Sequence, residues 1–124
     1  MKCVDRKLSA LLLLIGLAIF SPPASAQETA GIGALTCSRL LSIYETLEGA
    51  EQQEFYVAIH QWAYGFFTGQ NRQLRDNRRR DLRALTVETT ADEILSLCRM
   101  DPSARVWRKA DVLFQRLAYV SPGV

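Results

Sequence analysis

Histidine is nearly absent from the sequence: the 124 residues contain one, His60, and no CxxC, HxxxH or HExxH spacing occurs. Ordinary structural and catalytic zinc sites are built from clusters of Cys and His ligands, so the sequence excludes them. Glycine-rich phosphate-binding loops and the GxSxG nucleophile motif are also missing. We therefore expect no metal, no cofactor and no catalytic residue, and predict that the protein is not an enzyme. His60 is interpreted as a histidine at the core edge or the surface.

Long apolar runs are limited to the start of the chain, where residues 8–20 are almost wholly apolar. Basic residues precede this run, Ser-Pro-Pro breaks it, and Ala24-Ser25-Ala26 places small side chains where a signal peptidase reads them. The run has about 13 residues, whereas a helix that spans a bilayer needs roughly 20. The sequence predicts a signal peptide over residues 1–26 and a periplasmic protein without stable membrane insertion. An uncleaved N-terminal anchor is the alternative.

Neither positive nor negative charge is in excess when the predicted signal peptide is left out of the count. Removing its three basic residues and one acidic residue from the 15 and 13 of the whole chain leaves 12 of each. This balance and the export signal argue against a nucleic-acid-binding protein. In acid the carboxylates are protonated, and the remaining bases, His60 and the amino terminus bring the net charge to about +14. We expect acid to weaken the fold, because like charges repel and carboxylates paired with Arg lose their partners.

Cysteine is scarce, with Cys3 in the predicted leader and only Cys37 and Cys98 after it. An even pair of cysteines in an exported chain favours a disulfide, because export places them in an oxidising compartment. The bond would close a loop of roughly 60 residues and stabilise the fold by about 4 kcal/mol in the chain-entropy account. Two reduced, separate thiols are the alternative.

The sequence does contain apolar residues at helical spacing. Thr36 precedes a first helix, which Gly49 ends, and its apolar face comprises Cys37, Leu40, Leu41, Tyr44 and Leu47. A second helix is predicted over residues 51–67, where Gly65 indicates close approach by another backbone and Gly69 marks the end. Its apolar residues form two adjacent stripes: Phe55, Ile59, Trp62 and Phe66, then Tyr56, Ala63 and Phe67. This arc is wider than one ordinary core face, so the helix is either central to the fold or meets another chain.

Two more helices are predicted in the second half of the chain. A T-x-x-E capping box from Thr90 to Glu93 opens a helix that runs to Met100. Asp101 caps the last helix, which has Pro102 at its first position and extends to about residue 119.

No segment of useful length alternates with a period of two. The fold class is therefore predicted as all-α, a small single-domain bundle of about four helices with one disulfide. The helical domain covers residues 36–120. A flexible N-terminal arm over residues 27–35 precedes it, and a C-terminal tail over residues 121–124 follows.

A basic stretch interrupts the helical pattern at residues 71–83, where we expect an exposed loop. It is either a solvated connector or a patch for an acidic partner, because guanidinium forks suit carboxylates and phosphates. The arginines of this candidate patch are Arg72, Arg75, Arg78, Arg79, Arg80 and Arg83. Their pairing with an acidic cluster, within the chain or between chains, is an open alternative. The cluster comprises Glu45, Glu48, Glu51 and Glu54.

Several of these features occur in one order: Cys37, the segment WAYGFFTG from Trp62 to Gly69, a polar loop, and the segment CRMDP that begins at Cys98. With the final amphipathic helix, this pattern resembles the HdeA/HdeB family of periplasmic acid-stress chaperones over about residues 35–119. The resemblance implies a small all-helical protein in which Cys37 and Cys98 form the disulfide. It also implies an inactive homodimer at neutral pH, and a chain that loosens in acid and binds unfolding proteins.

The leading functional hypothesis is thus a periplasmic holdase of the acid stress response. Its client-binding or dimer surface is our inference from the second helix and comprises Phe55, Ile59, Trp62, Phe66 and Phe67. The alternative is an exported binding or immunity-type protein with one dedicated protein partner at neutral pH, which would meet the arginine-rich loop. A small structural protein of the envelope is a third hypothesis.

Overall fold

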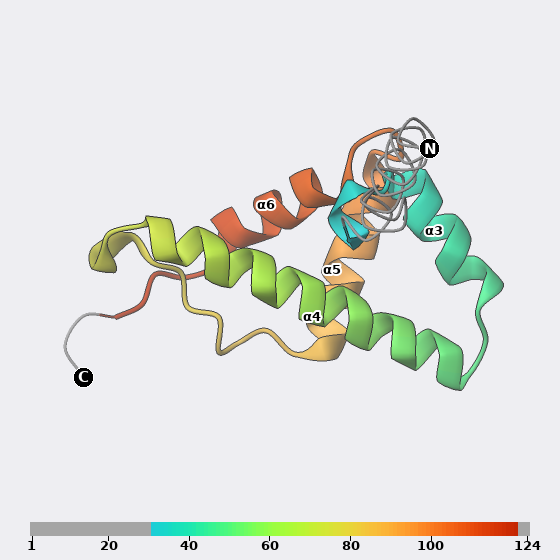
Figure 1. Ribbon diagram of the computed structural model, residues 1–124, viewed down its shortest axis with the longest axis horizontal. Helices are drawn as coiled ribbons and strands as arrows, with labels where there is room; N and C mark the ends of the chain where they lie inside the picture. Colours follow the sequence, from blue (N-terminus) through green and yellow to red (C-terminus); the bar gives the residue numbers. More distant parts are fainter. Residues whose placement is uncertain (1–30, 122–124) are drawn as a thin grey trace, which may run out of the picture.

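The structure is a computed structural model that describes residues 31–121 (Figure 1). The elements in chain order are η2 (Ile32–Ala34), α3 (Cys37–Thr46), α4 (Ala50–Gln73), η3 (Asp76–Arg78), α5 (Val87–Met100) and α6 (Val106–Arg116), where η denotes a 3-10 helix. Within the described part of the chain there is no strand, so the prediction of an all-α domain with four helices is confirmed. The predicted signal peptide lies outside the described residues, as do parts of the predicted arm and tail.

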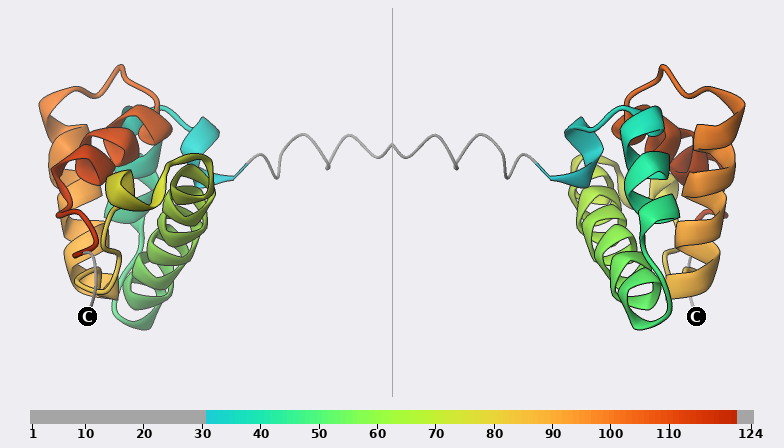
Figure 2. Two further views of the ribbon diagram at one scale, coloured as in Figure 1. Left: turned by 90° about the vertical axis from the view of Figure 1, so that its left-hand side faces the viewer. Right: turned by 90° about the vertical axis from the view of Figure 1, so that its right-hand side faces the viewer.

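Helix α5 packs against every other α-helix. It contacts α3, α4 and α6, and six of its 14 residues are buried. Helix α4 runs the length of the molecule along one side of the bundle (Figures 1 and 2). Only Ile59, Ala63 and Phe67 of its 24 residues are buried. Part of the apolar arc of this helix therefore stays half-buried at the surface, and its contact with another chain stays a prediction.

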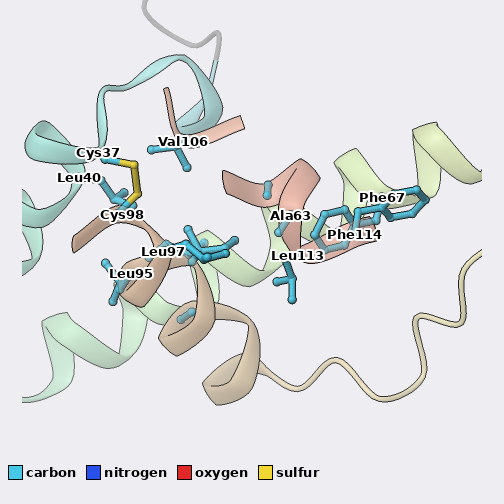
Figure 3. Packing of buried hydrophobic residues seen from close by; sticks show 14 residues of the cluster. Cys37, Leu40, Ala63, Phe67, Leu95, Leu97, Cys98, Val106, Leu113 and Phe114 are labelled. Carbon is cyan, nitrogen blue, oxygen red and sulfur yellow. A yellow bond between two sulfur atoms is a disulfide. The ribbon is translucent and has the colours of Figure 1, made fainter. Parts of the chain in front are cut away.

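The core extends from the disulfide to an aromatic pair (Figure 3). Cys37 and Cys98 are bonded and fully buried, which confirms the predicted disulfide between the start of α3 and the end of α5. At the other end the rings of Phe67 and Phe114 stack with their centroids 5.5 Å apart. The core therefore joins all four helices, with its covalent link at one end only.

Glycine placement differs from the sequence prediction. Helix α3 ends at Thr46, and Gly49 precedes α4 with φ 56°, a conformation that favours glycine. Gly69 does not end α4, which continues to Gln73, because a glycine weakens a helix without forbidding it. No atom lies within 4 Å of a Cβ placed at Gly65, so the close approach by another backbone that we expected is absent among residues 31–121.

Helix α5 begins earlier than predicted, and helix α6 begins later. The capping box of α5 lies four residues before the predicted one, since Thr86 and Thr89 cap the helix reciprocally with hydrogen bonds of 3.0 and 3.1 Å. Helix α6 covers only Val106–Arg116, and Asp101 ends α5 instead of capping α6. Residues 102–104 are held in a loop because the carbonyls of Pro102 and Ala104 accept hydrogen bonds from the first two amides of α3. Such tertiary bonds leave no local signal in the sequence.

The prediction of a flexible arm over residues 27–35 is wrong for the last residues of that range. Ile32–Ala34 form η2, Gly33 is buried, and Ile32 and Leu35 pack against the core. The chain is held there by the bond from the Val106 amide to the Leu35 carbonyl at 2.9 Å. Residues 31–35 therefore belong to the folded domain and form one wall of a groove.

Candidate functional site

The structure divides the five predicted client-binding residues into two groups. Ile59 and Phe67 are fully buried in the core. Phe55, Trp62 and Phe66 pack against the core but remain half-buried at the surface of α4. Only the second group is available in the folded state, and the first becomes available only if α4 separates from the bundle.

Two of the half-buried rings form the floor of an open groove of about 530 Å³. The rings of Trp62 and Phe66 stack at 5.4 Å with an angle of 15° between their planes. The walls are η2 and the start of α6, and the lining residues are Gly33, Ala34, Trp62, Phe66, Arg105 and Trp107. Sequence reasoning missed Gly33, Ala34, Arg105 and Trp107 as members of one site. The one available signal was that both tryptophans of the chain gather there.

Gly33 sets the position of the Trp62 ring. A Cβ on Gly33 would lie 2.2 Å from Cζ2 of Trp62, far inside van der Waals contact. The backbone of η2 therefore lies directly against the indole. Since the ring belongs to the groove floor, Gly33 is a requirement of the groove as well as of the fold.

Gly33→Ala is expected to lower the free energy of unfolding by about 1–3 kcal/mol, because the ring or η2 must move to admit the methyl group. Gly65→Ala is the matched control: it has open space around its Cβ and is expected to raise the free energy by about 0.5–1 kcal/mol. Urea unfolding of both variants measures the two effects. Equal effects in the two variants would contradict the packing of Trp62 on Gly33.

The six arginines of the candidate patch do not form one surface. Arg72, Arg79 and Arg83 line a depression of about 560 Å³ beside Tyr64. Arg78 and Arg80 line a different one of about 270 Å³. Arg79 is paired with Asp76 at 3.1 Å and Arg83 with Asp81 at 2.7 Å. No ion pair joins Arg72 or Arg75 to another residue of 31–121.

The Arg80 side chain forms contacts within the fold. Its Nη1 donates to the Leu117 carbonyl at 2.8 Å, its Nη2 donates to Gln115 Oε1 at 3.1 Å, and its guanidinium lies 4.1 Å from the Tyr119 ring centroid. Its backbone exchanges hydrogen bonds of 2.8 and 2.9 Å with the Asn71 side chain. Arg80 therefore ties the loop after α4 to the chain after α6.

The glutamate cluster is at the opposite end of α4 from the arginines (Figure 1). The 24 residues of α4 span about 36 Å. Within the described range none of these glutamates forms an ion pair, so pairing with the arginines inside the chain is wrong. Pairing between chains stays a prediction.

Four side chains among residues 31–121 have shifted pKa values, and one of them is Arg83, whose pKa is raised by its hydrogen bond to Asp81. The hydrogen bonds from Arg83 lower the pKa of Asp81 to about 2, and those from Lys109 and Ser103 lower the pKa of Asp101. The Tyr56 hydroxyl donates to Asp92 Oδ1 at 2.5 Å, and this bond, with burial, raises the pKa of Tyr56. The Tyr56–Asp92 bond also joins α4 to α5.

His60 occupies a core-edge position, where its Nδ1 lies 3.1 Å from the buried hydroxyl oxygen of Thr90. No three His, Cys, Asp or Glu side chains between residues 31 and 121 are grouped to hold a metal ion. None of the helices in that same range combines the length and apolar character that crossing a membrane requires.

No family model matches the chain, and neither a similar curated protein nor a similar solved structure was found. The resemblance to the HdeA/HdeB family accordingly remains a prediction from the sequence pattern.

Proposed function

We propose that the protein is a periplasmic acid-stress holdase, which loosens at low pH and binds unfolding proteins through the apolar face of α4. The observation that carries the proposal is the division of that face. Phe55, Trp62 and Phe66 are half-buried, and they adjoin Ile59 and Phe67, which are fully buried. Separation of α4 from the bundle would join the two groups into one apolar surface.

We expect acid to release helix α4, which lies outside the covalently linked part of the core. The disulfide binds α3 to α5, whereas α4 is held to α5 by side-chain packing and by the Tyr56–Asp92 and His60–Thr90 hydrogen bonds. In acid the carboxylates lose their charge while the arginines keep theirs. Repulsion among the arginines then favours opening, while the disulfide keeps α3 and α5 together.

The two carboxylates with lowered pKa values also predict that acid weakens the fold. Asp81 and Asp101 have folded-state pKa values below the ordinary value of 3.8. Their ion pairs therefore stabilise the fold above about pH 4, and this contribution disappears as the pH falls through the folded-state values. Both pairs lie at the surface, so they add to acid opening without dominating it.

Arg83→Gln is expected to raise the pKa of Asp81 from about 2 toward 3.8, because it removes the guanidinium hydrogen bonds that lower it most, while the bond from the backbone N–H of residue 83 remains. Stability should then vary less between about pH 4 and pH 2, since the titration of Asp81 would differ less between the folded and unfolded states. NMR titration of the Asp81 carboxyl carbon measures the shift, with Arg75→Gln as the control. An unchanged titration in Arg83→Gln would show that Arg83 does not act on Asp81 in solution.

Light scattering of an acid-unfolded client protein tests the proposal. The oxidised protein should suppress client aggregation at about pH 2–3 and not at pH 7. Phe55→Ser and Phe66→Ser should raise the concentration of the protein needed to suppress client aggregation by about twofold or more, because they remove apolar contact area. Tyr64→Ser, on an exposed part of α4, is the control and should behave as the parent protein. Absence of suppression at both pH values would remove the holdase proposal.

A dedicated protein partner is the second candidate, supported by the depression that Arg72, Arg79 and Arg83 form beside Tyr64. Guanidinium groups at such a surface suit an acidic partner. Charge reversal at Arg72 and Arg75 is the appropriate test, because neither forms an ion pair within residues 31–121. Tight binding at neutral pH that survives both reversals would contradict this candidate. Reversal at Arg80 would disturb the fold instead.

A further inference from the structure

We propose that the groove between η2, α4 and the start of α6 is a peptide-binding site of the folded protein at neutral pH. It would take an extended segment in which an aromatic or long aliphatic side chain stands next to a carboxylate. This goes beyond the holdase activity, since it requires no opening of α4.

The floor of the groove suits an apolar side chain. Trp62 and Phe66 are stacked with their ring planes 15° apart, and both rings line the groove. Trp107 stands beside them from α6 with 42% of its surface exposed. Large, partly exposed aromatic rings with their neighbours excluded from water are the usual anchors of binding energy at protein interfaces.

The groove is held in shape before any ligand arrives. The Gly33 backbone fixes the Trp62 ring, and Arg105 Nη1 donates to the Ala34 carbonyl at 2.7 Å. The Val106 amide and the Leu35 carbonyl join the same two walls at 2.9 Å. A preformed site avoids the ordering cost that a flexible surface has on binding.

Charge at the groove selects an acidic segment. The lining contains Arg105 and no carboxylate. One of the five N–H donors of this guanidinium is used by Ala34, and the fork can still offer donors to a carboxylate. Arg108 adds positive charge, with its guanidinium 5.3 Å from the Trp107 ring centroid. The nearby Asp101 is occupied by Lys109 at 3.3 Å.

The openness of the groove favours a peptide over a lipid. A lipid tail gains by being enclosed, and small-molecule sites bury most of their ligand. This groove of about 530 Å³ is a largely open depression, so a tail would stay partly in water. One side chain of an extended peptide can fill the aromatic floor while its neighbours remain solvated, as peptide-recognition grooves commonly allow.

Fluorescence anisotropy with labelled peptides at about pH 7 tests the site on the folded, oxidised protein. The probes are Gly-Ser-Phe-Leu-Asp-Ser-Gly and two versions in which Asn or Lys replaces Asp. We expect saturable binding of the Asp peptide at concentrations below about 1 mM, and affinity at least about fivefold weaker for the Asn and Lys peptides. Trp107→Ala should weaken binding about tenfold, and Arg105→Gln should remove the preference for Asp over Asn.

Val112→Ala is the matched control, because Val112 is an exposed apolar residue of α6 that does not line the groove. It should bind like the parent protein, and circular dichroism should show all three variants folded. Four results would overturn the proposal: no binding of any probe, equal binding of the three peptides, equal loss in Trp107→Ala and Val112→Ala, or a parent dimer that Trp107→Ala dissociates. The last would identify a second copy as the occupant. None of them bears on client aggregation in acid, so the holdase proposal fails or stands separately.

Discussion

Loss of the Cys37–Cys98 disulfide is expected to lower the free energy of unfolding at neutral pH by about 4 kcal/mol. The bond links residues 61 apart, and the chain-entropy account assigns this size of effect to such a loop. The free energy of unfolding of a small domain is about 5–15 kcal/mol, so much of the stability of this protein depends on the disulfide. Urea unfolding of the oxidised protein and of the double variant Cys37→Ala/Cys98→Ala measures the difference.

Treatment of the oxidised protein with a reducing agent gives an independent value for the same effect. Both sulfur atoms are fully buried, so the double alanine variant also loses packing and should be at least as destabilised as the reduced protein. A reduced protein as stable as the oxidised one would show that the disulfide does not constrain the unfolded chain as described.

Arg80→Ala is expected to lower the free energy of unfolding by about 2 kcal/mol, although arginine substitutions at a surface loop usually change it by less than about 0.5 kcal/mol. The variant removes two hydrogen bonds to the end of α6 and the stacking on Tyr119, so only backbone hydrogen bonds still join the loop after α4 to the C-terminal segment. Urea unfolding measures the loss, with Arg75→Ala as the control in the same stretch.

A second observation separates Arg80 from its neighbours. Arg80→Lys should recover only part of the stability, because an ammonium group cannot reproduce the planar fork that donates to two acceptors. If Arg80→Ala and Arg75→Ala were equally stable, Arg80 would be the solvated connector residue that the sequence pattern also allowed.

What the sequence predicts well depends on local chemistry. Thr36 caps α3 by accepting a hydrogen bond from the Arg39 amide, and a cap of this kind is visible in the chain itself. The 3- and 4-residue spacing of apolar residues gives the four helices, since periodicity is local too. The disulfide followed from the count of cysteines and the predicted export.

The errors arise where contacts join distant parts of the chain. Thr90 and Glu93 matched a capping box, but Thr86 and Thr89 form the real one, and Thr90 is buried against His60. Arg80 looked like one of six equivalent arginines until its partners beyond residue 114 were known. These partners are set by tertiary packing, which outweighs local preference.

The groove could not be predicted for the same reason. Its residues come from η2, α4 and the start of α6, which the fold brings together through backbone bonds such as Val106 to Leu35. The predicted surface on α4 contained Trp62 and Phe66, which line this groove, and also Ile59 and Phe67, which face the core. Periodicity shows that a helix face is apolar; it does not show which part of that face is covered.

Hydrogen–deuterium exchange at pH 7 and at about pH 2.5 tests the central claim most directly, namely that acid releases α4 from the bundle. Expressed as protection factors, which correct for slower intrinsic exchange in acid, the amides of residues 55–67 should be protected at pH 7 and lose that protection at pH 2.5. Amides beside Cys37 and Cys98 should retain more of theirs, because the disulfide holds α3 to α5. Equal protection of residues 55–67 at both pH values would contradict the account.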